Sequence, residues 1–389
     1  MEYALTDRDV YADEHREFAE SVSAFLRRRV TPRVAEFEQA GMVAPEIYRA
    51  AAELGMVGLQ IPEQYGGGGQ DGFLFNCVVT EQVAYERATL GSLRVHTDVV
   101  TPYVLGLADA EQRQRWLPGM ADGTTMASIA MTEPGAGSDL AGIRTSLQRR
   151  GPDWVLTGSK SFITGGAQSD LILVVARSDA AADRRKGLTL AVVASSMDGF
   201  SRGAPLDKLG LKAQDTTELF FDDVVVPAQN ILGEPGRAFE YLTANLARER
   251  LSIAVNSQAQ AVAAHHMTCA YVRERQIFGS ALGGFQNTKF VLADLATQIS
   301  AGQALVDRAM ARHEGGRLTP AEAAQTKLYC TELHGRVTDA CLQLHGGYGY
   351  TWEQDICRMY ADARVARIYG GTSEVMKGII ARTLDLVPR

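Results

Sequence analysis

Apolar residues in the first third of the chain recur at helical spacing. From Tyr11 to about Asp122 they fall three or four positions apart, as Phe18, Val22 and Phe25 illustrate. This spacing puts the apolar side chains on one face of a helix, where they can be buried together. The pattern predicts an all-helical N-terminal domain over residues 1–122.

The pattern changes between about Gly123 and Glu234. Four short runs rich in β-branched residues are separated by clusters of Gly, Asp, Ser and Pro: WVLTG, DLILVVARSD, GLTLAVVAS and TTELFFDDVVVP. Such runs with turn residues between them are typical of strands. We therefore expect a central antiparallel β-barrel over residues 123–234.

Helical periodicity returns in the last third. It extends over Arg237 to Arg275, Thr288 to His313, Pro320 to Leu344 and Ser373 to Leu386, with glycine clusters between the segments. This predicts a C-terminal domain over residues 235–389 that resembles a four-helix bundle. The expected fold class is α+β with several domains, in the order helices, barrel, helices.

Composition excludes several classes of protein. The chain has 389 residues, of which 46% are hydrophobic and 22% charged, as in ordinary globular proteins. The net charge of −7 comes without a block of like charges, so nucleic acid is not an expected partner. The longest uncharged stretch, 251–272, contains many polar residues, so no membrane span is expected. The acidic N-terminal segment does not resemble a signal peptide, which favours the cytoplasm.

Metal and nucleophile motifs are weak or absent. The five cysteines are widely spaced without CxxC, and the seven histidines form no HExxH, so neither a disulfide framework nor a metal site is expected. GGGQDG and GFSRG fit short patterns for dinucleotide binding and for a nucleophilic serine. Neither has the strand-to-helix context that those sites require.

Two segments have residues suited to binding a polar ligand. In AMTEPGAGSDLAG, Thr132 and Ser138 offer hydroxyls, and the glycines around Gly137 leave backbone N–H groups accessible, as a flat ring or phosphates require. A tight loop is an equally good interpretation. In KSFITGG, alternation places Phe162 and Thr164 on one strand face, where they would stack on a planar cofactor or fill the barrel wall.

The second segment begins at Gln343. QLHGGYGYTWEQDICRMYAD has glycines that permit close backbone approach, and the later IYGGTSEVMK leads into a helix whose N-terminus could hold an anion. Ser373 and Glu374 could equally mark only a helix start.

Together these segments resemble the two signatures of the acyl-CoA dehydrogenase family. The first is met at Ala130 to Gly142, and the second by Gln343, Glu353, Arg358 and Asp362. VGLQIPEQYGG, DKLGLKAQDTTELFFDDVVVP and RERQIFG also resemble the family, so the similarity extends nearly end to end.

The resemblance implies non-covalent FAD, with Thr132 and Ser138 near the flavin and pyrophosphate and with Phe162 and Thr164 against the isoalloxazine ring. Family members usually have Trp at the position of Phe162 and Asn at that of Gly165. Phe keeps an aromatic face but lacks the indole N–H donor.

It also implies a homotetramer, a dimer of dimers, in which Arg275, Phe278, Gln343 and Gly347 contact a neighbouring subunit's FAD. Thr372 and Glu374 fall on the adenosine side. The full set of implied FAD residues is Met131, Thr132, Gly137, Ser138, Phe162, Thr164, Arg275, Phe278, Gln286, Gln343, Gly346, Gly347, Thr372 and Glu374. Electron transfer flavoprotein is the implied electron acceptor.

The catalytic base departs from the commonest family pattern. Most members read IYEGT, with Glu as the base, whereas this chain has Gly370. A subset resembling long-chain and isovaleryl enzymes has the Glu on a helix, and Glu249 in LARERLSIAV fits that place. Glu249 shares an apolar stripe with Leu246 and Ile253, which predicts a partly desolvated carboxylate with a raised pKa. The alternative is an exposed Glu paired with a neighbouring arginine.

The resemblance implies α,β-dehydrogenation of an acyl-CoA or acyl-carrier-protein thioester. Glu249 would take the α-proton, the flavin the β-hydride, and the Gly370 N–H would polarise the carbonyl. The expected substrate residues are Ser138, Arg250, Tyr369 and Arg94. Arg94 falls near the closed end of the family's acyl cavity and would indicate a polar or acidic acyl tail. The alternative is an exposed or helix-capping arginine.

Two other functions stay open at this point. Relatives with this fold also act as oxidases or monooxygenases that use O2, and a flavoprotein without a base would serve only as a scaffold.

Overall fold

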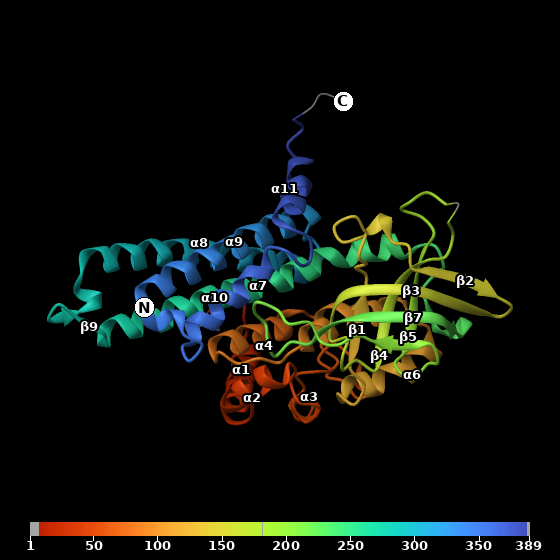
Figure 1. Cartoon of the computed structure of the whole chain (residues 1–389), viewed down its shortest axis with the longest axis horizontal. Helices are drawn as coiled ribbons and strands as arrows, with labels where there is room; N and C mark the ends of the chain where they lie inside the picture. The colour runs from red at the N-terminus through yellow and green to blue at the C-terminus, as the bar shows by residue number, and fades with distance from the viewer. Residues whose placement is uncertain (1–7, 181, 387–389) are drawn as a thin grey trace.

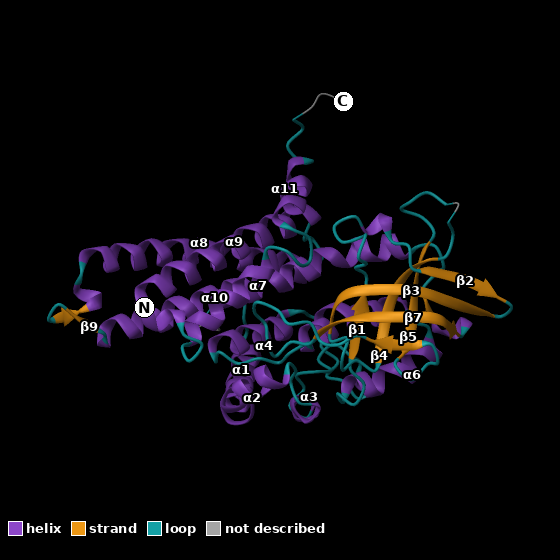
Figure 2. Ribbon diagram, viewed as in Figure 1, coloured by secondary structure: helices purple, strands orange, loops and turns teal. Residues whose placement is uncertain are grey.

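The structure is a computed structural model that describes residues 8–180 and 182–386. Residues 1–7 of the predicted N-terminal domain, with the start of the segment compared to a signal peptide, lie outside the described residues, as do 181 and 387–389. The predicted order of helices, sheet and helices is found (Figures 1 and 2). The three parts lie against one another, with the sheet at one end of the molecule (Figure 2).

Short helices form the N-terminal part. They are α1 (Asp13–Phe25), α2 (Val34–Ala40), α3 (Pro45–Ala52), α4 (Leu74–Tyr85), α5 (Thr101–Leu107) and α6 (Ala110–Ala121), with a π-helical segment η4 (Val95–Val100) before α5. α6 begins at a capping box, in which the Asp109 side chain and that of Gln112 each bond the other's backbone N–H. Phe37, Ile47 and Tyr48 centre the core of this part.

The middle part is one sheet. Its strands are β1 (Ala127–Ala130), β2 (Ser146–Arg150), β3 (Asp153–Thr164), β4 (Leu171–Arg177), β5 (Leu188–Ala194), β6 (Phe200–Arg202), β7 (Thr216–Val226) and β8 (Ile231–Leu232). They follow the order β6-β7-β3-β2-β4-β5-β8, and β1 also pairs with β4.

The expectation of a closed antiparallel barrel is wrong. The sheet is open, and β1 pairs with β4 in parallel. Its edge strands β6 and β8 have three and two residues, too few to form a ladder that would close the sheet. The pattern of strand runs could not reveal this, because alternation is the same in an open sheet and in a barrel.

Both faces of the central strands are buried. On β4, Leu173 and Val175 pack with Tyr103 and Trp116 of the helices, whereas Ile172 belongs to the core on the opposite face. This explains why DLILVVARSD reads as a continuous apolar run instead of an alternating one.

The C-terminal part consists of long helices. They are α7 (Ala238–Glu274), α8 (Gln286–Glu314), α9 (Pro320–His345), α10 (Asp355–Ala366) and α11 (Ser373–Ala381), with the small pair β9 (Gln276–Ile277) and β10 (Ser280–Ala281) between α7 and α8. Four of these fall on the predicted helical segments, with ends that differ by a few residues. α10 was not predicted as a helix. Among the described residues, no helix has the length and hydropathy needed to cross a membrane.

Helix α7 connects the three parts. Its 37 residues correspond to about 55 Å, and Figure 1 shows it extending from the sheet toward the β9 end of the molecule. Between Glu249 and His265 nearly every side chain is buried, since α4, α8 and α9 pack around it. Small residues such as Ala254 and Ala261 permit this close packing.

Candidate active site

Glu249 lies in the interior at the point where α7 meets α5. Glu249 is only 6% exposed. The Tyr103 hydroxyl donates a hydrogen bond of 3.0 Å to its Oε1. Tyr103 itself is fully buried. No ion pair to Glu249 is found among residues 8–180 and 182–386, and Arg248 donates to Gln60 instead. The alternative of an exposed, arginine-paired Glu249 is therefore wrong.

The surroundings of Glu249 raise its pKa. Burial raises the pKa of Glu249 to about 7, against the hydrogen bond from Tyr103 and the attraction of Arg250 and Arg248, which lower it. A carboxyl group with a pKa near 7 can both accept and release a proton at neutral pH, as a general base requires.

Gly370 lies against the side chain of Ile253, a residue of α7. Its φ is +64°, and a Cβ added there would collide with Cδ1 of Ile253, one helical turn after Glu249 on α7. The loop at position 370 thus contacts α7 about one helical turn after Glu249. A side chain at position 370 would require Ile253 to shift and would strain the backbone, because a φ of +64° is unfavourable for residues other than glycine.

A buried lysine holds the Gly370 loop. Lys327 of α9 is 1% exposed and donates a hydrogen bond from Nζ to the carbonyl oxygen of Gly371. Burial, together with a smaller effect from the charge of Arg250, lowers the pKa of Lys327 to about 8. Arg250 is also buried, so two cationic side chains lie beside this loop.

Tyr103 and Lys327 are site residues that the sequence did not indicate. Lys327 stands on the apolar stripe of α9 together with Cys330 and His334, and a lysine in such a stripe is a usable signal. Tyr103 has no such signal, because it is separated from Glu249 by 146 positions in the chain.

Hydrogen bonds to the buried side chain of Glu133 hold the loop after β1 in place. Glu133 accepts hydrogen bonds from the backbone N–H groups of Arg144 (2.7 Å) and Thr145 (2.9 Å) and from Lys160 Nζ (2.8 Å). Lys160 is completely buried, and burial lowers its pKa to about 8 although Glu133 raises it. This buried ion pair fixes the base of the loop.

The tip of that loop faces outward beside β3. The Ser161 N–H donates to the carbonyl of Thr132 at 2.9 Å, which joins the loop to β3. Met131 and Thr132 are half-buried, whereas Gly137 and Ser138 are exposed. Hydroxyl and backbone groups are therefore accessible to a ligand next to Phe162.

Phe162 occupies an unusual position in β3. It is 67% exposed, has a φ of +59°, and lies in a β-bulge where the register against β7 shifts between Lys160 and Ile163. The bulge interrupts the simple alternation that placed Phe162 and Thr164 on one face. Because Phe162 is exposed, it does not fill the sheet interior, and its ring is free to stack on a planar group. At Gly165, a Cβ would lie 3.0 Å from Cβ of Ser92, so a larger residue has little room.

The remaining cofactor candidates form a separate group at the far end of α7. The Arg275 guanidinium lies over the Tyr348 ring, 5.4 Å from its centroid, and Phe278 is 95% exposed. Gln286, Gln343, Gly346 and Gly347 are exposed as well. The 26 residues from Glu249 to Arg275 span about 40 Å of helix. Figure 1 shows the β9 end and the sheet at opposite ends of the molecule.

Helix α11 begins directly after the Gly370 loop. The Thr372 hydroxyl caps it by accepting a hydrogen bond from the Val375 N–H at 3.3 Å, and Glu374 is exposed in its first turn. Tyr369 is half-buried and precedes Gly370. The TSE segment is thus a helix start that follows the Gly370 loop directly.

Comparison with known proteins identifies the family. The chain matches the N-terminal domain of acyl-CoA dehydrogenase over residues 12–124, the middle domain over 128–224 and the C-terminal domain over 236–384. The chain belongs to the acyl-CoA dehydrogenase family. Its members are oxidoreductases that act on acyl-CoA and bind FAD.

Several other acyl-CoA dehydrogenases are similar to this chain over nearly its whole length. The mitochondrial long-chain specific acyl-CoA dehydrogenase of Rattus norvegicus is 43% identical, with 98% of this chain and 89% of the relative covered. A crystal structure of acyl-CoA dehydrogenase from Geobacillus kaustophilus has a TM-score of 0.95 and 40% identity, covering 97% of this chain and 99% of the other.

Two further solved structures are similar over nearly the whole chain. A glutaryl-CoA dehydrogenase from Mycobacterium smegmatis, in complex with FADH2, has a TM-score of 0.90 and 26% identity over 98% of this chain and 97% of the other. A structure described as the electron transferring flavoprotein of Acidaminococcus fermentans has a TM-score of 0.92 and 29% identity over 97% of this chain and 99% of the other. The exposed ring of Phe162 and the open loop at Gly137 suit a flavin and its phosphates.

We expect Glu249→Gln to stabilise the protein in alkaline but not in acidic solution. Because the pKa of Glu249 is raised to about 7 in the folded state, the folded protein holds this proton more tightly than the unfolded chain. The stability that the folded state gains from holding this proton is fully present below about pH 4.5 and is lost as the pH rises through about 7. Gln cannot ionise, so the variant should gain up to about 3 kcal/mol near pH 8.

Melting temperatures across a pH series check this, with Glu20→Gln as a control because Glu20 is exposed on α1. Equal pH dependence of the parent protein and Glu249→Gln would contradict the expectation.

Proposed function

We propose that this chain catalyses FAD-dependent α,β-dehydrogenation of an acyl-CoA thioester, with Glu249 as the base. The observation that supports this most is the buried Glu249 carboxylate, which has a pKa of about 7 and lies one helical turn before Ile253, the residue that the Gly370 loop contacts. The family membership of the chain supports the reaction class.

The residues around Glu249 suit the removal of an α-proton. As a carboxylate it is destabilised by burial, and it becomes neutral when it takes the proton, so the surroundings favour the transfer. The Tyr103 hydroxyl holds Oε1 in one place during this step. FAD, when bound, accepts the hydride from the β-carbon.

Other residues would bind the thioester. In the described part of the chain, the backbone N–H of Gly370 has no hydrogen-bond partner, and it is suited to polarise the thioester carbonyl. Arg250 and Tyr369, on either side of that loop, would shape the thioester site. Ser138 at the exposed tip of the loop after β1 would contact both substrate and cofactor.

We propose a homotetramer in which each FAD is contacted by two chains. Phe162, Thr164 and the 131–138 loop would hold one part of the cofactor, and Arg275 of a second copy another part. About 40 Å along α7 separate Glu249 from Arg275, farther than one FAD can bridge within a single chain. The exposed Phe278 and its neighbouring aromatics would be covered by the second copy.

The electron acceptor in this proposal is electron transfer flavoprotein, in line with the flavoprotein described among the similar structures. An acyl-carrier-protein thioester is a second substrate form that the same chemistry would serve. The comparisons name dehydrogenases and do not favour an oxidase that uses O2, and a buried base argues against a scaffold that lost catalysis. A cytoplasmic location stays a prediction.

The proposed function is tested by Glu249→Gln. The substitution removes basicity but keeps size, so the flavin spectrum and thioester binding should survive while flavin reduction slows by about 10²- to 10⁴-fold. In the parent protein the reduction rate should rise with pH as Glu249 ionises, and the variant should lack that rise. Anaerobic stopped-flow with butyryl-, octanoyl- and adipyl-CoA measures this. Parental rates in the variant would show that another group is the base.

Moving the carboxylate to position 370 tests whether the two positions serve one α-carbon. Gly370→Glu alone should disturb the loop, because its Cβ would collide with Ile253 at a φ of +64°. Combining it with Glu249→Gln and Ile253→Ala opens space and should restore part of the reduction rate. Recovery should stay below the parental rate, since a misplacement of about 1 Å can cost 10²-fold. A well-folded, flavin-loaded triple variant without any recovery would contradict the shared geometry.

Arg275→Ala should weaken FAD retention and shift the oligomer toward smaller species. It removes a permanently charged donor that can pair with phosphate oxygens of the partner's cofactor. Sedimentation and the flavin-to-protein ratio measure both effects, with Arg273→Ala as the control because Arg273 is exposed in the last turn of α7. Normal FAD content with an unchanged sedimentation profile would refute the second-chain role.

A further inference from the structure

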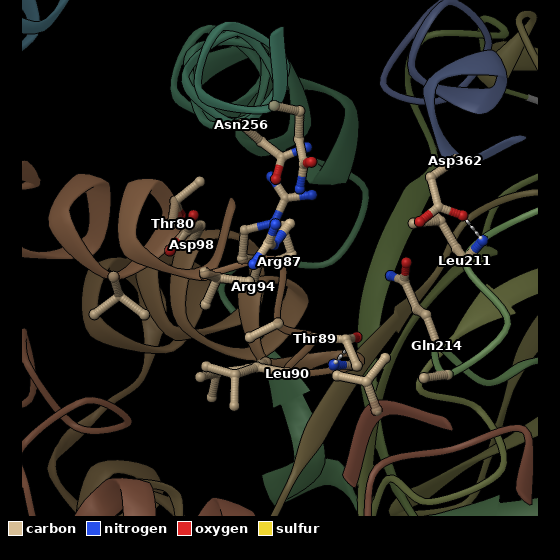
Figure 3. A pocket seen from close by; sticks show the side chains of 18 of the residues that line it. Thr80, Arg87, Thr89, Leu90, Arg94, Asp98, Leu211, Gln214, Asn256 and Asp362 are labelled. Carbon is tan, nitrogen blue, oxygen red and sulfur yellow. Dashed lines mark hydrogen bonds between the residues drawn. The ribbon is translucent and has the colours of Figure 1, made fainter. Parts of the chain in front are cut away.

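A cavity of about 100 Å³ lies where the three parts of the chain meet, and Tyr369 of the Gly370 loop is part of its wall. Most of the remaining wall comes from α4, the segment 87–94, η4, the segment 211–214, α7, α9 and α10, with smaller contributions from α2 and the segment 56–59. In Figure 3, Arg94 and Asp98 lie on the side of the N-terminal helices, below Asn256 of α7, and Gln214 and Asp362 form another wall. The cavity therefore extends away from the proposed thioester site.

Many of the cavity-lining side chains are polar or charged, which is unusual for a space that would receive a hydrocarbon tail. Most of the cations already have partners. Arg87 pairs with Asp355 at 3.2 Å, Arg358 pairs with Asp355 at 2.9 Å, and Lys212 pairs with Asp207 at 2.6 Å. Their charges are therefore balanced within the protein.

The acidic residues of the wall also have donors. Asp98 is buried and accepts hydrogen bonds from Asn76 (2.7 Å), Thr97 (2.8 Å) and Ser252. Asp362 accepts one from the backbone N–H of Leu211. Glu38, the third carboxylate, lies 3.6 Å from Arg358.

Arg94 differs from the other cavity-lining cations. Its one hydrogen bond, from Nη1 to the carbonyl oxygen of Ser252, is 3.3 Å long, and no carboxylate within residues 8–180 and 182–386 forms an ion pair with it. It stands at the N-cap of η4, but its side chain makes no capping bond. It is half-buried, so the expected alternative of an exposed or helix-capping arginine does not apply.

Polar groups of two long helices line the same cavity. Asn256 and Gln260 contribute amides from α7, and His334 of α9 is 2% exposed with no hydrogen-bond partner for either ring nitrogen in the described residues. A buried imidazole without a partner is costly unless a ligand supplies one. The cavity thus offers one unpaired cation together with unpartnered neutral polar groups.

We propose that Arg94 binds a carboxylate at the end of the acyl group, so that the preferred substrate is a dicarboxylic acyl-CoA. This rests on the proposed function, because the thioester end of the same acyl group would lie between Glu249 and Gly370. A guanidinium forms two parallel hydrogen bonds with a carboxylate, whereas a hydrocarbon end would leave Arg94 desolvated and unpaired.

The position of Arg94 limits the length of that acyl group. Ser252, its present acceptor, follows Glu249 by three positions, and Asn256 follows by seven, so the two lie about 5 and 10 Å farther along the axis of α7. A carboxylate bound at Arg94 is therefore one to two helical turns from the α-carbon. Diacids of short to medium length, such as adipyl, fit this separation better than long chains.

The test compares adipyl-CoA with hexanoyl-CoA, which has the same chain length and no carboxylate. In the holoenzyme, anaerobic flavin reduction at low substrate concentration should be faster with adipyl-CoA. Arg94→Met should lower this rate for adipyl-CoA by about 10- to 100-fold, as expected for a lost hydrogen bond to a charged group, and leave hexanoyl-CoA equal or improved. Arg94→Lys should retain part of the preference, since the charge remains.

Two further experiments test whether the preference for adipyl-CoA comes from a specific contact with Arg94. Arg87→Met removes another cavity-lining cation, one already paired with Asp355, and should keep the preference for adipyl-CoA. In Glu249→Gln holoenzyme, calorimetry should show tighter binding of adipyl-CoA than of hexanoyl-CoA, and Arg94→Met should abolish that difference.

The outcomes distinguish this inference from the proposed function. Reduction by hexanoyl-CoA without any preference for adipyl-CoA, or an equal loss for both thioesters in Arg94→Met, would overturn the role of Arg94 and leave the dehydrogenase proposal intact. Reduction by neither these thioesters nor the butyryl and octanoyl compounds would overturn both.

Discussion

The burial of the Glu249 carboxylate against Tyr103 is the constraint on which the rest of the site depends. A carboxylate in the interior is unfavourable in its charged form, and the hydrogen bond of 3.0 Å from Tyr103 offsets only part of that cost. The cost is what gives the residue a pKa of about 7. It also requires that α5, α7 and the Gly370 loop pack closely, because water at this point would lower the pKa toward the ordinary value.

Two other buried charged groups support the same region. Lys327 fixes the Gly370 loop from α9, and the Lys160–Glu133 pair fixes the loop after β1 from inside the sheet. Each such group is costly if its partner is removed, and each therefore favours one conformation of an otherwise glycine-rich loop. The loops proposed to bind ligands are thus held by buried contacts at their bases, as preorganised binding requires.

The length of α7 sets the distance between the two groups of proposed cofactor residues. One continuous helix carries Glu249 in its first half and ends at Glu274, next to Arg275. The residues proposed to bind one cofactor therefore lie at opposite ends of a chain. In the proposed homotetramer, two copies related by a two-fold axis and lying antiparallel would each complete the other's site. The exposed aromatic side chains near β9 and η8 (Gly346–Tyr350) fit a surface that a second copy covers.

Local sequence determined much of this protein. Helical periodicity located α7, α8 and α9 to within a few residues, apolar runs located the main strands, and the stripe through Leu246 and Ile253 indicated that Glu249 faces the interior. These features depend on neighbours along the chain, which a periodicity can record. The tertiary structure alone decided the others. The sheet is open because β6 and β8 are short, Phe162 is exposed because a bulge against β7 turns it outward, and Tyr103 reaches Glu249 across 146 positions. Each of these features arises from contacts between segments that are distant in the chain, and the spacing of residues within one segment carries no information about such contacts.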